Sequence, residues 1–355
     1  MPTVYLTEQG STVRRDGETL LVQIPEDKTT GRSKQSVQIP LIKVDQVVVH
    51  GNITLTAPAV EMLLSRGIGI SYCSAYGQFR GRLEAAESRN GLLRVAQYAG
   101  QADPARRLAL AQAMVAGKLH NQRTLLLRAN RKRDLPDLAR AAESIGAALG
   151  QVGAVNEPVL PDDVLAEPQP PDNPLGRLMG LEGTAAAAYF GAFPHLLHNA
   201  FGFAGRVRRP PTDPVNALLS YGYTLLMHQV RSAIHTVGLD PYVGFLHAGR
   251  YGRPSLALDL MEEFRPVLVD SVVMRAINTN VLGDQHFRRE AEAVWLTQSG
   301  RKLFLAQWEQ RLTSEIRHPI FDYTVAYRRC LELQVRLLAK ALTGDIPAYP
   351  PFKVR

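Results

Sequence analysis

Cysteine is nearly absent from this chain of 355 residues, which has only Cys73 and Cys330. Two cysteines cannot build a disulfide framework or a zinc ribbon of two Cys-x-x-Cys pairs, and free thiols are typical of a reducing cytoplasm. No uncharged apolar run reaches the length of about 18 residues that a membrane-spanning helix needs, and the N-terminal end has no secretory signal pattern. We therefore expect a cytoplasmic protein without a membrane partner.

Acidic residues are fewer than basic residues in this chain. The chain has 41 Lys and Arg against 33 Asp and Glu, a formal net charge of +8, and 45% of its residues are apolar. That apolar content is enough for ordinary hydrophobic cores, and the length favours two domains. The positive surplus favours polyanionic partners, nucleic acid first, although many basic proteins bind none.

Two kinds of hydrophobic pattern divide the sequence. Short apolar runs in the first part predict strands and one helix that starts at Thr56, whereas later apolar residues recur with a helical period. We predict an α+β protein with a β-rich domain at 1–88, an all-α domain at 89–345 and a Pro-rich tail at 346–355. Strands are expected near 4–6, 20–24, 37–42, 46–49, 68–72 and 78–82, helices within 92–130, 137–149, 180–204, 213–237, 256–277 and 301–341, and a loop at 160–174.

A histidine followed by a group of acids is the strongest chemical signal. His247 precedes a Gly/Pro turn, and Asp259, Glu262 and Glu263 follow at spacings that place three carboxylates on one helix face. Crowded carboxylates favour a cation, and an imidazole beside them makes an N/O site suited to Mn²⁺ or Mg²⁺. Alternatively, His247 is a satisfied histidine at the end of a helix or strand, and Glu262 and Glu263 lie on a solvated helix face.

Glu182 is a further candidate ligand, because a run of small residues follows it and small residues let helices approach closely. Such packing could bring Glu182 against His247 and Glu262, with positions left for water and phosphate oxygens. Alternatively, Glu182 only complements the dipole at a helix start. His195 and His198 have a spacing compatible with zinc but no third ligand nearby, which favours a structural role.

Basic residues are concentrated in parts of the chain. Residues 94–140 contain ten Lys or Arg and three Asp or Glu, so this segment either follows a DNA backbone or forms a solvated helix with charged edges. A second group lies at 206–209, where arginines beside a metal could clamp phosphate oxygens. The candidates for nucleic-acid contact are Lys118, Arg123, Arg206, Arg208, Arg209, Arg250 and Arg253.

Four segments, in this order, resemble the CRISPR-associated spacer-acquisition endonuclease and integrase family, and the resemblance covers essentially the whole chain. The segments are Gly180–Gly183, Pro210–Ser220, Leu239–His247 and Asp259–Pro266. The resemblance implies Mn²⁺ or Mg²⁺ held by Glu182, His247 and Glu262, with Asp259 as a further catalytic carboxylate. The third ligand is Asp in some branches of the family and Glu in this sequence.

The resemblance also implies a function: insertion of short foreign DNA as new spacers into a CRISPR array, by attack of 3′-hydroxyl ends on phosphodiesters of the repeat. It implies double-stranded DNA as substrate, a homodimer paired through the β-rich domains, and a heterohexamer with a dimer of the small second CRISPR-associated protein. The alternatives are a catalytically idle DNA-binding scaffold of the adaptation complex, a metal-dependent phosphohydrolase of small substrates, and a purely structural protein.

Overall fold

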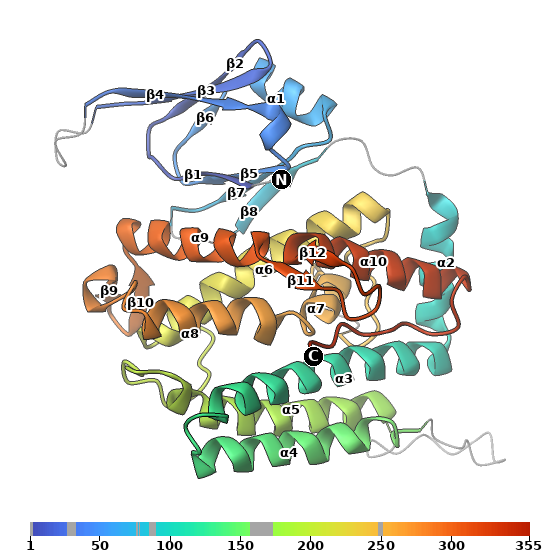
Figure 1. The fold of residues 1–355 in the computed structure, drawn as a ribbon. Coiled ribbons are helices and arrows are strands. Elements are labelled where there is room, and N and C mark those ends of the chain that lie inside the picture. The colour runs from blue at the N-terminus through green and yellow to red at the C-terminus, as the bar shows by residue number, and fades with distance from the viewer. Residues whose placement is uncertain are drawn as a thin grey trace. The chain divides into compact units, whose positions relative to one another are not determined.

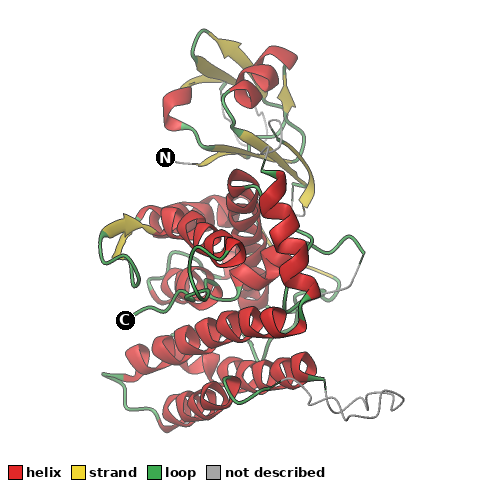
Figure 2. Ribbon diagram, turned by 90° about the vertical axis from the view of Figure 1, so that its right-hand side faces the viewer, coloured by secondary structure: helices red, strands yellow, loops and turns green. Residues whose placement is uncertain are grey.

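The chain divides into two compact units, Met1–Glu87 and Ser88–Arg355 (Figure 1). Strands dominate the first unit and helices the second (Figure 2). The predicted α+β class is therefore confirmed. The computed structural model describes residues 3–26, 33–75, 77, 79–84, 90–156, 173–247 and 251–355.

The elements of the first unit are β1 (Thr3–Leu6), β2 (Thr12–Asp16), β3 (Thr19–Ile24), β4 (Gln35–Pro40), a 3-10 turn (Leu41–Lys43), β5 (Gln46–His50), β6 (Thr54–Leu55), α1 (Ala57–Ser65), β7 (Gly69–Cys73) and β8 (Phe79–Leu83). They form two four-stranded sheets, in the orders β1-β5-β7-β8 and β4-β3-β2-β6. Strand β5 pairs in parallel with both β1 and β7. All five of its residues are buried, as is typical of the centre of a parallel sheet.

One hydrophobic core joins the first unit, and side chains from both sheets and from α1 contribute to it. Strand β2 was not among the predicted strands, because only Val13 of its five residues is buried and its other side chains are polar or charged. The helix predicted from Thr56 is present as α1, with Thr56 at the N-cap position.

The second unit is mainly helical. Its helices are α2 (Gly91–Ala102), α3 (Pro104–Asn130), α4 (Pro136–Val152), α5 (Pro174–Ala192), α6 (Pro214–Val237), α7 (Ser255–Met261), a π-helical turn (Arg265–Asp270), α8 (Ser271–Asn278), α9 (Gln298–Thr313) and α10 (Tyr327–Thr343), with 3-10 turns at Phe193–Leu196 and Asp284–His286. Helices α3, α4 and α5 pack side by side, each against the other two (Figure 1). No helix in the described ranges is long and apolar enough to cross a membrane.

The expectation of an all-α second domain is wrong in one respect, because this unit contains two antiparallel hairpins. They are β9 (Phe287–Glu290) with β10 (Ala293–Leu296), and β11 (Glu315–Arg317) with β12 (Thr324–Ala326). Strands of three or four residues are too short to show an alternating pattern in the sequence. The predicted run 301–341 is accordingly interrupted by β11 and β12.

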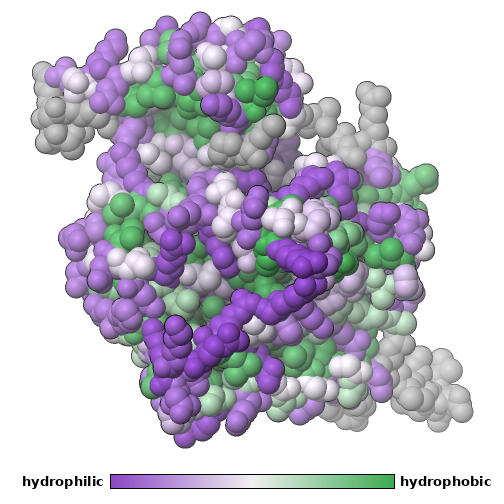
Figure 3. Space-filling view, in the orientation of Figure 1, coloured by the Kyte–Doolittle hydropathy of each residue, from purple (hydrophilic) through white to green (hydrophobic). Residues whose placement is uncertain are grey.

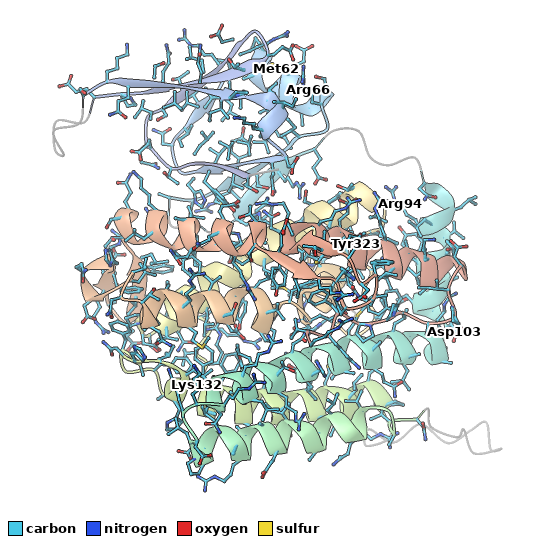
Figure 4. The ribbon with its side chains drawn as sticks, viewed as in Figure 1. Met62, Arg66, Arg94, Asp103, Lys132 and Tyr323 are labelled. Carbon is cyan, nitrogen blue, oxygen red and sulfur yellow. The ribbon has the colours of Figure 1, made fainter. Side chains whose placement is uncertain are left out.

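The predicted run 92–130 is also two helices. Asp103 ends α2, and its side chain accepts a hydrogen bond from the backbone N–H of Arg106, so it caps the start of α3. Figure 4 labels Asp103 at one end of α3 and Lys132 just beyond the other. The predicted loop at 160–174 lies almost entirely outside the described residues.

The C-terminal tail has no helix or strand, but it is packed into the helical unit. Tyr349, Phe352 and Val354 are buried, and the ring of Phe352 stacks on Phe264 with 4.7 Å between centroids. The tail is therefore part of a core and does not stand apart from it.

Candidate metal and nucleic-acid site

Two glutamates from different elements meet at one buried lysine. Lys118, in the middle of α3, pairs through Nζ with Glu182 Oε1 on α5 and lies 2.6 Å from Glu262 Oε2 at the end of α7. Lys118 is 5% exposed and Glu262 is 3% exposed, whereas Glu182 is partly open to solvent. The expected approach of Glu182 to Glu262 is therefore present, and a cation lies between them.

Glu262 is a buried carboxylate that stays ionised. Burial raises its pKa, but Arg265 and Lys118 outweigh burial and hold the pKa at about 2. Arg265 Nη2 lies 3.1 Å from Glu262 Oε1, so the two oxygens of this carboxylate have different cationic partners. No sequence pattern predicts the role of Lys118, whereas Arg265 follows Glu262 by three residues, a spacing typical of a helical ion pair.

His247 is fixed by a carboxylate. Its Nδ1 lies 2.8 Å from Asp259 Oδ1, and Asp259 also accepts hydrogen bonds from the backbone N–H groups of Phe245, Leu246 and His247, at 2.6, 3.0 and 3.0 Å. An imidazole that donates from Nδ1 leaves Nε2 as the ring nitrogen for a metal. Both oxygens of the fully buried Asp259 are occupied by these bonds, so this geometry suits a residue that positions His247 rather than a ligand.

Gly244 makes room for this arrangement. A Cβ atom at this position would lie 2.7 Å from Asp259 Oδ2 and 2.7 Å from the backbone carbon of Ser255. The backbone of the loop before His247 can therefore approach the Asp259 carboxylate only because residue 244 has no side chain.

The expectation that Asp259, Glu262 and Glu263 share one helix face is wrong. Helix α7 ends at Met261, before the last two of them, and each carboxylate has different partners. The alternative of a solvated face is wrong as well, since all three are buried. In the part of the chain that the structure describes, no three His, Cys, Asp or Glu side chains form a group that could hold a metal as they stand. Lys118 Nζ takes the position between the glutamates.

Glu263 holds the C-terminal tail. Its Oε1 accepts a hydrogen bond from the Tyr349 hydroxyl at 2.7 Å, and its Oε2 accepts one from the backbone N–H of Phe352 at 2.5 Å. Asn121 of α3 donates to the backbone oxygens of Glu263 and Phe352, both at 2.8 Å. Burial raises the pKa of Glu263 to about 8, despite these hydrogen bonds, so this carboxyl is mostly protonated at neutral pH.

A second buried carboxylate lies next to Arg265. Asp270 accepts hydrogen bonds from the hydroxyls of Tyr189 and Tyr223 at 2.9 and 2.7 Å, and burial raises its pKa to about 6. The guanidinium groups of Arg206 and Arg265 lie over the Tyr223 ring, at 5.5 and 4.9 Å from its centroid. No sequence pattern singled out these tyrosines, because they come from α5 and α6 and meet Asp270 only in the fold.

Much of the basic segment 94–140 is used inside the protein. Arg106 donates two hydrogen bonds to backbone oxygens at the end of α10, at 2.6 and 2.7 Å, and Arg107 donates one at 2.9 Å to the loop before His247. Lys118 lies between the two glutamates. The predicted DNA-backbone surface is therefore restricted to the exposed remainder of this segment.

That remainder includes the C-terminal half of α3 and the turn that follows it. Arg123 is exposed, as are Arg131, Lys132 and Arg133. Figure 4 labels Lys132 at this end of α3, and Figure 3 shows hydrophilic side chains gathered there. These side chains are exposed, although Arg133 also donates a hydrogen bond to the backbone oxygen of His195 at 2.9 Å. Their role in DNA binding stays a prediction.

Arg206 differs from its neighbours because its guanidinium is held against α6. It donates to Asn216 Oδ1 at 2.8 Å and to Ser220 Oγ at 3.0 Å. These contacts suit an Arg206 that stabilises the loop against α6 better than an Arg206 that is free to clamp a phosphate. Of the other candidates, Arg208 and Arg209 are exposed, Arg253 is partly exposed, and Arg250 lies outside the described residues.

His195 and His198 do not converge on a metal position. His195 Nε2 lies 3.3 Å from Asp137 Oδ2, beside a shallow pocket of about 400 Å³ between α4 and α5. The backbone N–H of His198 donates to Asn278. These contacts agree with the structural role favoured from the sequence.

Comparison with known proteins gives matches that cover nearly the whole chain. The family model described as CRISPR associated protein Cas1 matches residues 4–310. CRISPR-associated endonuclease Cas1 2 of Rhodospirillum rubrum is 40% identical over 354 residues, which cover 99% of this chain and 97% of that protein. A Cas4/Cas1 exonuclease–endonuclease fusion of Geobacter sulfurreducens is 39% identical over 99% of this chain, and this chain spans 60% of the fusion's length.

Solved structures share the fold. A Cas1 protein from Thermotoga maritima superposes with a TM-score of 0.75 at 27% identity over 97% of each chain. A casposase bound to integration product superposes with a TM-score of 0.82 at 24% identity, over 100% of this chain and 95% of that one. A Cas6-RT-Cas1–Cas2 complex gives 0.77 at 24% identity, over 99% of this chain and 36% of that one. At these last two identities the likeness concerns the fold alone.

Proposed function

This chain belongs to the CRISPR-associated Cas1 family, and we propose that it is a divalent-metal-dependent DNA endonuclease and integrase that inserts short foreign DNA as new spacers into a CRISPR array. One observation carries the proposal. Glu182 and Glu262 converge on a buried cationic position, and His247 nearby has its Nδ1 fixed by Asp259. These three residues would supply two carboxylates and one imidazole nitrogen.

This donor set fits Mn²⁺ or Mg²⁺, which prefer carboxylate oxygen, accept imidazole, and keep positions for water and phosphate oxygens. Glu262 is ionised at neutral pH because Arg265 and Lys118 lower its pKa. Glu182, His247 and Glu262 would hold the metal. When bound, it would supply Lewis-acid polarisation of the scissile phosphodiester and neutralise charge on the leaving oxygen.

The chain's own residues prepare the site for this reaction. Asp259 keeps His247 in one orientation and one tautomer, and Arg265 holds Glu262 by its second oxygen. In the joining reaction, a 3′-hydroxyl of the short DNA forms a new P–O bond, the P–O bond of the repeat strand breaks, and the leaving 3′-oxygen takes up a proton. With water as the attacking group, the same site would cleave DNA. The exposed Arg123, Arg208 and Arg209 would contact phosphates of the DNA.

We also propose the assembly that the family resemblance implies. Two molecules would pair through their β-rich units, and two such dimers would bind a dimer of the small second CRISPR-associated protein and double-stranded DNA. A neighbour that is a Cas1–Cas2 complex supports this partnership. The alternatives are an idle DNA-binding scaffold and a phosphohydrolase of small substrates. A buried, ionised Glu262 argues against the scaffold, because burying this charge together with Lys118 and Arg265 has a desolvation cost that an idle site would not require.

Strand joining tests the proposal. Purified protein, with and without its small partner, is mixed with Mn²⁺, a short duplex with 3′-hydroxyl ends and a supercoiled plasmid that carries the repeat. We expect metal-dependent joined product, and we expect Glu182→Ala or His247→Ala to abolish joining while DNA binding largely survives. Equal loss of joining and binding would indicate damage to the fold. Tight binding without joining or cutting in any metal would support the scaffold.

A further inference from the structure

Lys118 differs from the lysines of a solvated helix. It lies in the middle of α3, is 5% exposed, and contacts two carboxylates that come from α5 and from the end of α7. Burial of a lysine is costly unless the ammonium is paired, and burial of a carboxylate beside a second one, as for Glu262 beside Glu182, is costly unless a cation lies between them. The three groups therefore stabilise each other in the structure as it stands.

The same oxygens cannot serve Lys118 and a divalent metal together. Lys118 Nζ contacts Glu182 Oε1 and Glu262 Oε2, which are the atoms that face the shared position. An ammonium left in that position would also repel the metal. The lysine side chain is flexible, with four methylene groups, so the ammonium can withdraw while the backbone of α3 stays in place.

Arg265 does not compete in this way. Its Nη2 contacts Glu262 Oε1, the other oxygen of that carboxylate. Its guanidinium also lies over the Tyr223 ring, 4.9 Å from the centroid, which fixes its place. A metal that enters between Glu182 and Glu262 would therefore displace Lys118 and leave Arg265 bound.

We propose that Lys118 is an internal counter-cation, which occupies the place of the divalent metal when none is bound and is displaced as the metal binds. This inference rests on the proposed function, because it requires a metal at Glu182, His247 and Glu262. Lys118 keeps the two glutamates from repelling each other in the metal-free protein. It does so at the expense of metal affinity.

Two measurements on the full chain test the inference without any assay of activity. Calorimetric titration gives the Kd for Mn²⁺, and thermal unfolding in EDTA and in Mn²⁺ gives the Tm of the metal-free and loaded protein. The variant is Lys118→Met, which keeps the length of the side chain and removes its charge. The matched control is Lys132→Met, a lysine that is exposed just beyond the end of α3.

For Lys118→Met we expect Mn²⁺ binding about tenfold tighter than in the wild type, which corresponds to about 1.4 kcal/mol. We also expect a lower Tm in EDTA and a larger rise of Tm on adding Mn²⁺, because only the metal then separates the two carboxylates. Lys132→Met should match the wild type in both measurements. If Lys118→Met does not fold, Lys118→Gln replaces it in the measurements of Kd and Tm. The glutamine amide is uncharged but can still donate hydrogen bonds to both glutamates.

Two other outcomes would overturn the inference, and they are distinguishable. Equal or weaker Mn²⁺ binding by Lys118→Met, with Glu182→Ala still weakening the wild-type affinity, would keep the metal site and show that Lys118 does not compete for it. Mn²⁺ binding that is absent, or unchanged by Glu182→Ala, would place no metal at these glutamates and would contradict the proposed function as well.

Discussion

Glu262 and Glu263 are adjacent, buried and chemically identical, yet at neutral pH the first is ionised and the second is mostly protonated. The Glu262 side comprises Glu262 with its cationic partners Lys118 and Arg265, and the pKa of this glutamate is about 2. The Glu263 side comprises Glu263 and the partners that donate neutral hydrogen bonds to it, and its pKa is about 8. Those partners are Tyr349 and the backbone N–H of Phe352.

The difference shows that the partners of a buried carboxylate, and not its burial, decide what it can do. A carboxylate held by mobile or exchangeable cations can exchange one of them for a metal. A protonated carboxyl that is hydrogen-bonded to the C-terminal tail has no charge to offer a metal and acts as an anchor. We therefore assign chemistry to the Glu262 side and folding to the Glu263 side, and each prediction below tests that division.

The largest expected effect on stability is on the Glu263 side. Phe352→Ala removes a fully buried ring that stacks on Phe264, so we expect a loss of about 3–5 kcal/mol in the free energy of unfolding. Urea denaturation checks this value. Arg355→Ala, three residues further and exposed in an ion pair with Asp322, should change it by less than about 1 kcal/mol. Similar small losses for both variants would show that the tail is not an anchor.

On the Glu262 side the expected effect is on rate. Glu262→Gln keeps the shape of the side chain and removes its charge, so we expect strand joining to fall by about 100- to 1000-fold, the size typical for loss of one catalytic contact. Glu263→Gln should leave the rate of joining within about fivefold of wild type, because Glu263 bonds the C-terminal tail and affects the reaction only indirectly. Single-turnover joining at saturating Mn²⁺ checks both. Equal losses of joining rate in the two variants would contradict the assignment of catalysis to Glu262 and of folding to Glu263.

Gly117 lies where α3 passes the Glu263 side. A Cβ atom there would be 2.9 Å from Glu263 Cγ and 3.0 Å from Pro351 Cβ, so Gly117→Ala should cost about 1–3 kcal/mol of stability. Gly150→Ala on α4 has nothing within 4 Å of the new methyl group. It should stabilise by about 0.5–1 kcal/mol through helix propensity. The denaturant midpoints of the two variants distinguish these outcomes. An unchanged midpoint for Gly117→Ala would mean that Glu263 and Pro351 can shift to accommodate the methyl group at little cost.

The last expected effect is a slope of stability with pH. The folded pKa of Glu263, about 8, is raised above the unfolded value of about 4.3. Its contribution to stability is therefore full below pH 4.3 and is lost as pH rises through 8, by about 1.4 kcal/mol per pH unit between the two pKa values. Glu263→Gln lacks this proton, so the stability of the wild type minus that of the variant should fall between pH 5 and pH 8. A difference that is constant with pH would contradict the assignment of a protonated Glu263.

Local patterns predicted most of the elements. The helix predicted at 213–237 is α6, and the strand predicted at 46–49 is β5, because a long amphipathic run and a compact apolar run each determine their own conformation. The change to helical periodicity near residue 91 coincides with the start of α2. Local patterns could not show where α7 ends. The residues after it continue as a turn and a π-helix, which keep a similar apolar pattern.

The candidate site was predictable only in part. Sequence motifs brought Glu182, His247 and Glu262 forward, and the fold brings the two glutamates together. Lys118 was expected among DNA contacts because it lies in a basic segment, and charge density along a sequence cannot show which side of a helix faces inward. The segment 346–355 was predicted only as a Pro-rich tail, and its packing could not be predicted because its partners are distant in the chain: Glu263 lies 89 residues from Phe352, and Asn121 lies 231.

Crystals of the full chain soaked in Mn²⁺, with anomalous scattering measured at the manganese edge, would show where the metal binds. We expect one strong peak bound by Glu182, His247 and Glu262, with Lys118 withdrawn and with Glu263 still bonded to Tyr349 and Phe352. A peak at Glu263 or Asp270, or no peak beside Glu262 with Lys118 still between the glutamates, would contradict this expectation.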